Sequence, residues 1–396
     1  MSKDIKITVI SNFCAHYRKN IYERLAQVYA ARFIFFSDGK DTYWESKNRI
    51  DLGDFEGEYL KGFWLTKKVR ITPDLIPKLL KDDSDVIIKD ITGRFALPVT
   101  FLITKIKKVP FILWTGVWQH PKTFFHTLTF PLMKWIYQGS DAVCVYGTHV
   151  KEYLSSLGVD PKKMFIAAQA VDNAKFSRDV PLEEKQQLKA KLNIGTRKVI
   201  LFVGQMEVRK GIYYLIDAVE KLDAEKVAVI LLGNGSHLED VKRIVEQRNM
   251  KQVIFLDYVD NNDLYRYYSI ADIFVLPSIT TANFKEPWGL VVNEAMNQGC
   301  PIVTTTAVGA AAGGLVKDGV NGYVVPEKDP GRLFQALDNI LTDDDLSQSM
   351  RNRSKDMIKN WTDEERLDGI VQAVSFSLQL KRAGEMVTKD EVVRHG

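Results

Sequence analysis

The stretch RKVILFVGQMEVRKG, residues 197–211, joins an apolar run to a glycine-containing loop and then to a helical pattern. An apolar run without alternation is typical of a strand that is buried on both faces of a sheet. The glycine that ends the run lets a ligand approach the backbone, and the following helix offers free amides. Arg209 and Lys210 add positive charge at the same edge. The stretch therefore suits a phosphate or diphosphate, although an ordinary connection with two solvated cations explains it equally well.

The same alternation of strand and helix continues on both sides of this stretch. Short β-branched or aromatic runs occupy residues 5–10, 33–36, 86–89, 111–114 and 142–146 in the first half, and 199–203, 227–232, 253–256, 273–276 and 302–305 in the second. Longer stretches with helical spacing, such as 17–29 and 123–137, separate them. This order predicts an α/β fold with parallel sheets. Two such series predict two doubly wound, Rossmann-like domains that face each other across a cleft.

A charged stretch near the middle of the chain indicates where one domain ends and the next begins. The predicted segments are an N-terminal domain (1–180), a linker (181–196), a C-terminal domain (197–360), a long helix (361–382) and a polar, frayed tail (383–396). The long helix is expected to begin at a capping box, in which Thr362 and Glu365 satisfy the first free amides.

The composition excludes several classes of protein. The chain has 396 residues, of which 45% are apolar and 26% charged, so it is neither disordered nor a collagen nor a coiled-coil rod. Its uncharged apolar stretches fall short of the roughly 18–20 residues that a spanning helix needs. We expect no secretory signal at the N-terminus. The three cysteines are odd in number and far apart, which favours a reducing, cytoplasmic setting over a disulfide framework or a cysteine metal site.

Charge is distributed unevenly along the chain. Residues 1–180 hold 27 Lys and Arg against 19 Asp and Glu, whereas residues 181–396 hold 27 against 31. A basic half suggests an anionic partner, such as a membrane surface, a phosphorylated acceptor or nucleic acid. An ordinary fluctuation of surface charge is the alternative.

Residues 101–140 combine five lysines and nine aromatic residues with no acidic residue. Such a segment suits the interface of an anionic membrane, where the protein would be peripheral. It would also suit single-stranded nucleic acid. A core helix with a solvated lysine face is the third interpretation. The five lysines are Lys105, Lys107, Lys108, Lys122 and Lys134.

Two further motifs follow strands in the second half. In LGNGS, Gly233 and Gly235 indicate either a tight turn or room for a planar ligand such as a base. In EPWGLVVNEAMNQG, residues 286–299, Glu286 precedes a short helix and Glu294 lies one turn inside it. Acceptor-only carboxylates suit vicinal hydroxyls, and free amides at the start of the helix suit a phosphate oxygen. Two surface glutamates near a helix start are the alternative.

These motifs carry a resemblance. The segment 199–341 resembles the C-terminal domain of the family-4 retaining glycosyltransferases, which have the GT-B fold. The matching features, in the family's order, are VGQMEVRKG, LLGNGS, ADIFVLPS, the pair Glu286 and Glu294 with seven residues between them, and the GCPIVTT…VG…DGVNGYVV block. Upstream, residues 170–176 look like the family's "VD…F" signature. In this fold the final helix crosses back to the first domain, so the helix over 361–382 is expected to do the same.

The resemblance implies that a nucleotide-sugar lies in the cleft and that the acceptor lies against the N-terminal domain. Lys210 and Arg209 would neutralise the diphosphate, and Glu286 would contact the transferred sugar. Glu294 would bind the ribose. The implied donor-binding residues are Gly204, Gln205, Gly233, Gly235, Gly289, Leu290 and Glu294. Such enzymes need no metal, because cationic side chains and a helix dipole stabilise the departing diphosphate. A catalytic histidine on the first-domain side is also implied.

His120, in FILWTGVWQHP, is the first candidate for that histidine and His16 the second, and each is equally well read as an ordinary histidine. The chain departs from the family pattern at Gln205, where arginine is usual, and at residues 313–314, where a carboxylate is usual. The family's glycine-rich acceptor loop is replaced by residues 11–19. Arg209 is expected to supply the charge missing at Gln205. These departures leave the acceptor undefined.

The predicted function is therefore a retaining glycosyltransferase that moves a sugar from a nucleotide-sugar to a glycan or lipid-linked acceptor, in polysaccharide or glycolipid assembly. A catalytically silent subunit on the same fold is the main alternative. A dinucleotide-dependent oxidoreductase would need a G-x-G-x-x-G turn. The chain has no such turn after its first strand, and the third glycine is missing after Gly233 and Gly235. Nucleic-acid binding has the least support, because it rests on the basic half alone.

Overall fold

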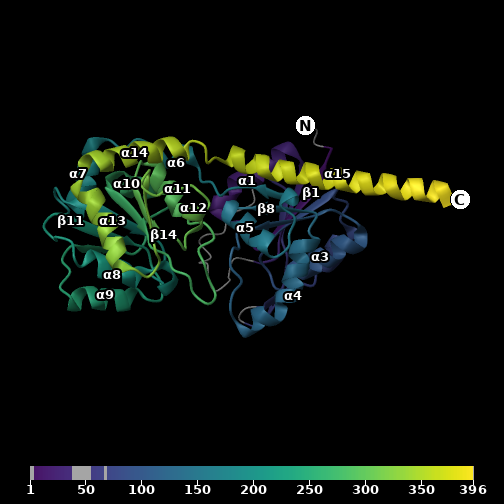
Figure 1. Ribbon diagram of the computed structural model, residues 1–396, viewed down its shortest axis with the longest axis horizontal. Coiled ribbons are helices and arrows are strands. Elements are labelled where there is room, and N and C mark those ends of the chain that lie inside the picture. The colour runs from purple at the N-terminus through teal and green to yellow at the C-terminus, as the bar shows by residue number, and fades with distance from the viewer. Residues whose placement is uncertain (1–3, 38–54, 67–68, 396) are drawn as a thin grey trace.

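The computed structural model describes residues 4–37, 55–66 and 69–395, with side chains as far as residue 383. Two lobes lie side by side, and the last helix runs from one along the other (Figure 1). Each lobe is built on a parallel β-sheet with helices on its faces. The prediction of an α/β fold with two parallel sheets is confirmed.

Within the described residues, the N-terminal sheet has seven strands in the order β3-β2-β1-β6-β7-β8-β9. Its strands are β1 (Lys6–Ser11), β2 (Ala30–Phe35), β3 (Gly57–Tyr59), β6 (Val86–Asp90), β7 (Phe111–Thr115), β8 (Ala142–Val145) and β9 (Met164–Ile166). Its helices are α1 (His16–Val28), α2 (Leu75–Lys81), α3 (Ala96–Lys107), α4 (Phe124–Gly139) and α5 (Thr148–Ser156). A separate antiparallel pair joins β4 (Phe63–Thr66) to β5 (Val69–Ile71). β6, β7 and β8 are buried along their whole length, as the unalternating runs predict.

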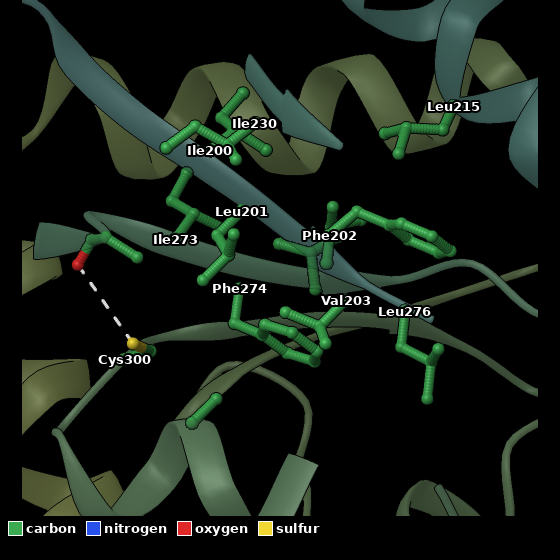
Figure 2. Close-up of a cluster of buried hydrophobic side chains, with 14 of the residues drawn as sticks. Ile200, Leu201, Phe202, Val203, Leu215, Ile230, Ile273, Phe274, Leu276 and Cys300 are labelled. Carbon is green, nitrogen blue, oxygen red and sulfur yellow. Dashed lines mark hydrogen bonds between the residues drawn. The ribbon is translucent and has the colours of Figure 1, made fainter. Parts of the chain in front are cut away.

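The C-terminal sheet has six strands in the order β12-β11-β10-β13-β14-β15. They are β10 (Lys198–Val203), β11 (Val227–Leu232), β12 (Val253–Leu256), β13 (Ile273–Leu276), β14 (Ile302–Thr305) and β15 (Gly322–Val325). The surrounding helices are α8 (Ile212–Val219), α9 (Leu238–Gln247), α10 (Leu264–Ile270), α11 (Leu290–Asn297), α12 (Gly309–Ala312), α13 (Pro330–Thr342) and α14 (Asp344–Ile358). Side chains of β10, β11 and β13 pack together as the centre of the core (Figure 2).

In both sheets the strand order reverses beside the first strand, between β1 and β6 and between β10 and β13. Ligands of open α/β sheets bind outside the carboxyl ends of the strands at such a point. The loops that follow β7 and β8 in one lobe contact the loop that follows β13 in the other. The carboxyl edges of the two sheets therefore meet.

Two segments differ from the prediction. The predicted linker over 181–196 contains a helix, α7 (Leu182–Lys191), whose LEEKQQLKAK sequence consists of strong helix formers, with acids in its first turn and lysines in its last. The final helix, α15 (Asp363–His395), does not end at residue 382. Its later sequence has no proline to stop it, so most of the predicted tail is helical; residue 396 lies outside the described residues.

α15 returns to the N-terminal domain, as the resemblance implies. Ile370, Ala373 and Val374 are fully buried against the N-terminal sheet. At Gly369 the helix lies so close to β9 that a Cβ atom there would come within 2.0 Å of the Ile166 carbonyl oxygen. The Thr362 hydroxyl accepts a hydrogen bond from the Glu365 amide (3.3 Å), which confirms the Thr362 half of the predicted capping box.

None of the helices in the described part of the chain has the length and apolar character needed to cross a membrane.

Candidate active site

The two domains meet through loops at the carboxyl edges of their sheets. On the N-terminal side, the loop after β7 supplies three contacts to the loop after β13. The Trp118 indole N–H donates to the Glu286 carbonyl oxygen (3.0 Å), and the Gln119 amide donates to the Thr281 carbonyl (3.2 Å). The Lys122 backbone N–H donates to the carbonyl of residue 282 (2.6 Å). Hydrogen bonds from the N-terminal domain therefore hold the segment that carries Glu286.

Glu286 forms the centre of the site. Its carboxylate oxygen Oε2 accepts from the Lys210 ammonium (2.5 Å) and from the Ser278 hydroxyl (3.1 Å). Lys210 lies in the short turn Val208–Lys210 after β10, and Ser278 comes directly after β13. The side chains of Lys210 and Glu286 are only 14% and 8% exposed. A partly desolvated cation thus lies beside a carboxylate at the point where the strand order reverses, which suits an anionic ligand that also carries hydroxyls.

Arg209 and Gln205 lie side by side at the rim of this site. The Arg209 guanidinium donates to the Gln205 side-chain oxygen and lies over the Phe284 ring, 4.5 Å from its centroid. The structure therefore places a cation next to the position where the family usually has arginine. Because Gln205 and the Phe284 ring both contact the Arg209 guanidinium, the position of this charge is restrained.

The loop after β11, which carries Gly233 and Gly235, packs closely against the loop after β10. Gly233 has a φ of +136°, and a Cβ atom there would lie 2.1 Å from the Gly204 carbonyl oxygen. A Cβ atom at Gly235 would lie 2.6 Å from the Met206 backbone nitrogen. The space that side chains would fill at Gly233 and Gly235 is occupied by the loop after β10. Close approach of these two loops is thus a reason for both glycines, and the role of Gly233 and Gly235 in donor binding stays a prediction.

The helix that carries Glu294 begins directly beside Glu286. Gly289 precedes α11 with a φ of +95°, and Leu290 is the first helical residue. Glu294 is buried, and its carboxylate accepts from the Tyr268 hydroxyl (2.7 Å). Burial raises the pKa of Glu294 to about 7, although the Tyr268 hydrogen bond and the charge of Lys175 lower it. Tyr268 is thus a partner of Glu294 that the sequence motif did not predict.

The two histidines singled out in the sequence have other partners. His120 Nε2 is 2.8 Å from the His126 carbonyl oxygen, and its ring lies 4.3 Å from that of Phe130, so His120 packs on α4. His16 is the first residue of α1, and burial lowers its pKa. Within the described residues, no hydrogen bond joins either ring to Glu286 or Lys210.

A third histidine, which the sequence analysis did not single out, reaches the loop of Glu286. His149 lies in the first turn of α5, and its Nε2 is 3.3 Å from the Pro287 carbonyl oxygen. Its ring lies against Trp118 (4.8 Å between centroids) and Trp288 (6.1 Å). Burial lowers the pKa of His149 to about 4, and the nearby Lys285 acts in the same direction. Its position shortly after the carboxyl end of β8 is the sequence feature from which its place near the site could have been predicted.

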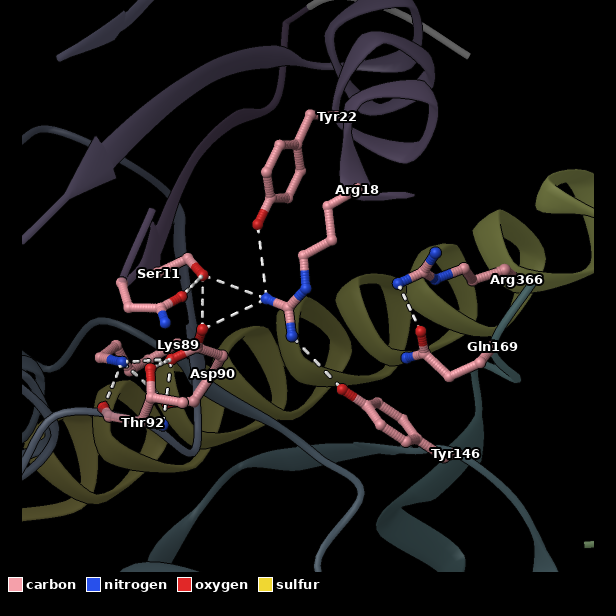
Figure 3. A network of polar contacts seen from close by, with 10 residues as sticks. Ser11, Arg18, Tyr22, Lys89, Asp90, Thr92, Tyr146, Gln169 and Arg366 are labelled. Carbon is pink, nitrogen blue, oxygen red and sulfur yellow. Dashed lines mark hydrogen bonds and ion pairs between the residues drawn. The ribbon is translucent and has the colours of Figure 1, made fainter. Parts of the chain in front are cut away.

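A buried polar network lies at the reversal point of the N-terminal sheet (Figure 3). The Arg18 guanidinium contacts Asp90 (3.2 Å), Ser11 (3.1 Å) and Tyr146 (3.3 Å). Burial alone would raise the pKa of Asp90, but Lys89 and Arg18 hold it well below its usual range. Ser11 and Arg18 belong to the segment 11–19 that replaces the family's glycine-rich loop, so this polar network stands where that loop would be.

A separate chain of hydrogen bonds links α15 to the Glu286 segment. The Arg366 guanidinium donates to the Gln169 side-chain oxygen (3.3 Å), and the Gln169 carbonyl accepts from the Asn293 side chain (3.1 Å). Asn293 in turn accepts from the Trp288 indole N–H (2.8 Å). The returning helix, the crossing between the domains and the loop of Glu286 are thus joined by consecutive hydrogen bonds.

The segment 101–140 folds as α3, β7 and α4, and its lysines do not form one free basic face. Lys105 pairs with Asp141 (2.9 Å), and Lys107 donates to the carbonyls of residues 79 and 82 at the end of α2. The sequence therefore indicated more unpaired lysines than the structure has, because Asp141, which pairs with Lys105, lies one residue beyond the segment. α4 also exposes an apolar face: Phe124, Leu128, Leu132 and Trp135 lie at helical spacing on its surface.

No group of three or more His, Cys, Asp or Glu side chains among the residues that the structure describes is arranged to hold a metal ion.

Comparison with known proteins shows which family the segment around Glu286 resembles. Residues 184–357 match the family model described as glycosyl transferases group 1. An uncharacterized glycosyltransferase of Methanocaldococcus jannaschii is 28% identical over 222 residues, 55% of each chain. A D-inositol 3-phosphate glycosyltransferase of Xylanimonas cellulosilytica is 30% identical over 217 residues, 52% of this chain and 49% of that one. The chain thus spans about half the length of these curated relatives.

Solved structures match over nearly the whole chain. The Anabaena protein HepE, in complex with UDP and glucose, superimposes with a TM-score of 0.76 at 17% identity and covers 94% of this chain and 99% of its own. WaaG, a glycosyltransferase involved in lipopolysaccharide biosynthesis, gives a TM-score of 0.68 at 16% identity, covering 92% of this chain and 99% of its own. These likenesses confirm the predicted fold. The chain has the GT-B fold, and its part from residue 184 to 357, which contains Lys210, Glu286 and Glu294, matches the glycosyl transferases group 1.

Proposed function

We propose that the protein is a retaining glycosyltransferase that moves a sugar from a nucleotide-sugar to a glycan or lipid-linked acceptor. The observation that carries the proposal is the Lys210–Glu286 pair, held by Ser278 where the two domains meet. Its support is the match of this segment to the glycosyl transferases group 1, together with a structural neighbour described in complex with UDP-glucose. A relative from Escherichia coli is an O-antigen chain mannosyltransferase, which favours a role in polysaccharide assembly.

In this proposal each end of the donor meets a different group. The diphosphate is neutralised by Lys210 and Arg209 and by the free amides at the start of α11, near Gly289 and Leu290. Glu294 binds the ribose hydroxyls, with one oxygen already engaged by Tyr268. Glu286 contacts the transferred sugar. No metal is required, because these fixed charges and dipoles stabilise the negative charge that develops on the leaving diphosphate.

The proposal assigns the N-terminal domain to the acceptor, and it includes reversible binding to an anionic membrane surface. Its support is the apolar face of α4, where Phe124 is 87% and Leu128 69% exposed, with the exposed Lys122 and Lys134 on the same helix region. Apolar side chains of this kind insert at the headgroup boundary, and each lysine near an anionic bilayer adds about 1 kcal/mol. The setting is thus cytoplasmic and peripheral.

The membrane part is tested with vesicles rather than with sugars. A variant with Phe124→Ser and Leu128→Ser should lose most of its binding to anionic vesicles at low salt. A control with Leu182→Ser, which removes a 70% exposed leucine from the C-terminal domain, should bind as the unchanged protein does. Equal binding by both variants would contradict the assignment of α4 to the membrane.

The transferase part is tested with a panel of nucleotide-sugars, scored by hydrolysis, by transfer and by thermal stabilisation. A ligand at 100 times its Kd adds about 2.7 kcal/mol to the free energy of unfolding. At least one donor should stabilise the protein and be turned over, and NMR of the product should show the anomeric configuration of the donor. Binding without turnover of any donor would instead indicate a catalytically silent subunit, and inversion of configuration would contradict the retaining mechanism.

A further inference from the structure

Two side chains of the N-terminal domain hold consecutive carbonyl groups of the loop that carries Glu286. Trp118, in the loop after β7, donates its indole N–H to the carbonyl oxygen of Glu286 (3.0 Å). His149, in the first turn after β8, has its Nε2 3.3 Å from the carbonyl oxygen of Pro287. Because β7 and β8 are neighbouring strands, the two side chains come from adjacent positions on one sheet edge. The N-terminal domain thus contacts the backbone of the site at two successive residues.

The two side chains are themselves fixed by packing. Their rings meet edge to face at 84°, with centroids 4.8 Å apart. The Lys285 ammonium lies 3.6 Å from the centroid of the Trp118 ring, and the Trp288 ring lies 6.1 Å from that of His149. His149 is only 5% exposed. Both hydrogen bonds are therefore made by rings with little freedom to move, in surroundings from which water is largely excluded.

The side chain of Glu286 is aimed away from these contacts, at Lys210 and Ser278. On the C-terminal side, the carbonyl that Trp118 holds also accepts from the Gly309 backbone N–H (3.0 Å). The peptide group is planar, so fixing the carbonyls of two successive residues fixes the backbone from which the Glu286 carboxylate extends. Displacement of a reacting group by about 1 Å is enough to lower turnover strongly.

We propose that Trp118 and His149 are positioning residues, which fix the Glu286 carboxylate from the opposite domain. The inference rests on the proposed function, in which Glu286 contacts the transferred sugar. The catalytic geometry is then complete only while the domains are in contact, because two of the groups that hold the Glu286 segment belong to the N-terminal domain. The nucleotide half of the donor is bound by C-terminal residues that neither ring contacts.

The kinetic test uses variants that remove the hydrogen bonds with little change of volume. Trp118→Phe and His149→Leu should each lower kcat by about three- to ten-fold, the effect of one hydrogen bond, and leave the donor KM within about two-fold. His149→Gln keeps a donor near Nε2 and should restore most of the turnover. Trp64→Phe removes an indole N–H from a 40% exposed tryptophan on β4 and should change neither constant. Unchanged kcat in Trp118→Phe, or equal losses in His149→Leu and His149→Gln, would overturn the proposal.

A second measurement does not depend on catalysis. Amide hydrogen exchange of residues 279–290, followed by mass spectrometry without substrate, should be faster in Trp118→Phe and His149→Leu than in the unchanged protein and in Trp64→Phe. Exchange at the unchanged rate would show that the two rings do not hold the loop, whatever the kinetics. If instead no donor is turned over by the unchanged protein, the proposed function fails, and the exchange rates still decide whether the two rings hold the loop.

Discussion

His149 should make the stability of the protein depend on pH. Burial lowers its pKa from the ordinary value of 6.5 to about 4; the Pro287 carbonyl opposes that change, and Lys285 adds to it. In the unfolded chain the ring takes up a proton near pH 6.5, and in the folded protein only near pH 4. Between these values the unfolded state binds more protons, so a falling pH favours unfolding. The stabilising contribution is thus present above pH 6.5 and is lost as the pH falls towards 4.

The size of the effect follows from the two pKa values. Each pKa unit corresponds to about 1.4 kcal/mol, so the displacement of His149 from 6.5 to about 4 corresponds to about 3 kcal/mol when the titration is complete. At pH 5 about 2 kcal/mol of this is already lost. The comparison is with His149→Gln, which keeps a donor towards the Pro287 carbonyl and cannot titrate. Burial also lowers the pKa of His16, but that residue is present in both proteins and cancels.

The assay is urea unfolding at pH 7.5 and pH 5, followed by far-ultraviolet circular dichroism for both proteins. Between the two pH values the unchanged protein should lose about 2 kcal/mol more of its free energy of unfolding than His149→Gln does. Losses that agree to within about 0.5 kcal/mol would refute the reasoning, because they would mean that the ring is as accessible to protons in the folded state as in the unfolded one.

Three other substitutions test separate parts of the site. Lys210→Met should weaken donor binding by about ten- to a hundred-fold in calorimetry, since it removes a charge-assisted contact; Lys226→Met, at an 81% exposed side chain, should not. Gly233→Ala should lower the free energy of unfolding by more than about 1 kcal/mol, because φ is +136° and the new methyl group meets backbone; a normal melting temperature would contradict this. Tyr268→Phe removes a hydrogen bond that lowers the pKa of Glu294, so donor binding should be recovered only at a higher pH than before; an unshifted pH profile would show that Tyr268 does not tune this carboxyl group.

Much of the fold could be predicted because buried parallel strands are continuous apolar runs. The runs at residues 227–232, 253–256, 273–276 and 302–305 coincide with β11, β12, β13 and β14. β3 and β9 were not predicted, since three residues are too few to show a period. The helix inside the predicted linker was missed for another reason: its apolar residues are few, so its charge pattern was read as that of a connection.

The site could be predicted only as far as motifs lie beside strand ends. Lys210 and Glu286 were located this way, but their ion pair joins residues 76 positions apart and depends on β10 and β13 being neighbours in the sheet. The partner of Glu294, Tyr268 on α10, lies 26 positions away in the sequence and could not be predicted from the motif either. The catalytic role of His120 stays a prediction, and the contacts between the domains were not predicted. The loop after β7 does reach Glu286, but it does so through Trp118, whereas the histidine that approaches the site follows β8.

The Lys210–Glu286 pair has a consequence for the order of events at the proposed site. Both side chains are largely buried, so each is the main compensation for the charge of the other, with Ser278 as the further partner of the carboxylate. A diphosphate that approaches Lys210 competes with Glu286 for the same ammonium group, and charge-assisted contacts to phosphate are at least as strong as those to carboxylate. Under the proposed function, donor binding therefore loosens the hold of Lys210 on Glu286 at the moment when the sugar arrives beside that carboxylate. Fixation of the Glu286 backbone by Trp118 and His149 then matters most, because it keeps the carboxylate in place once Lys210 contacts the phosphates instead.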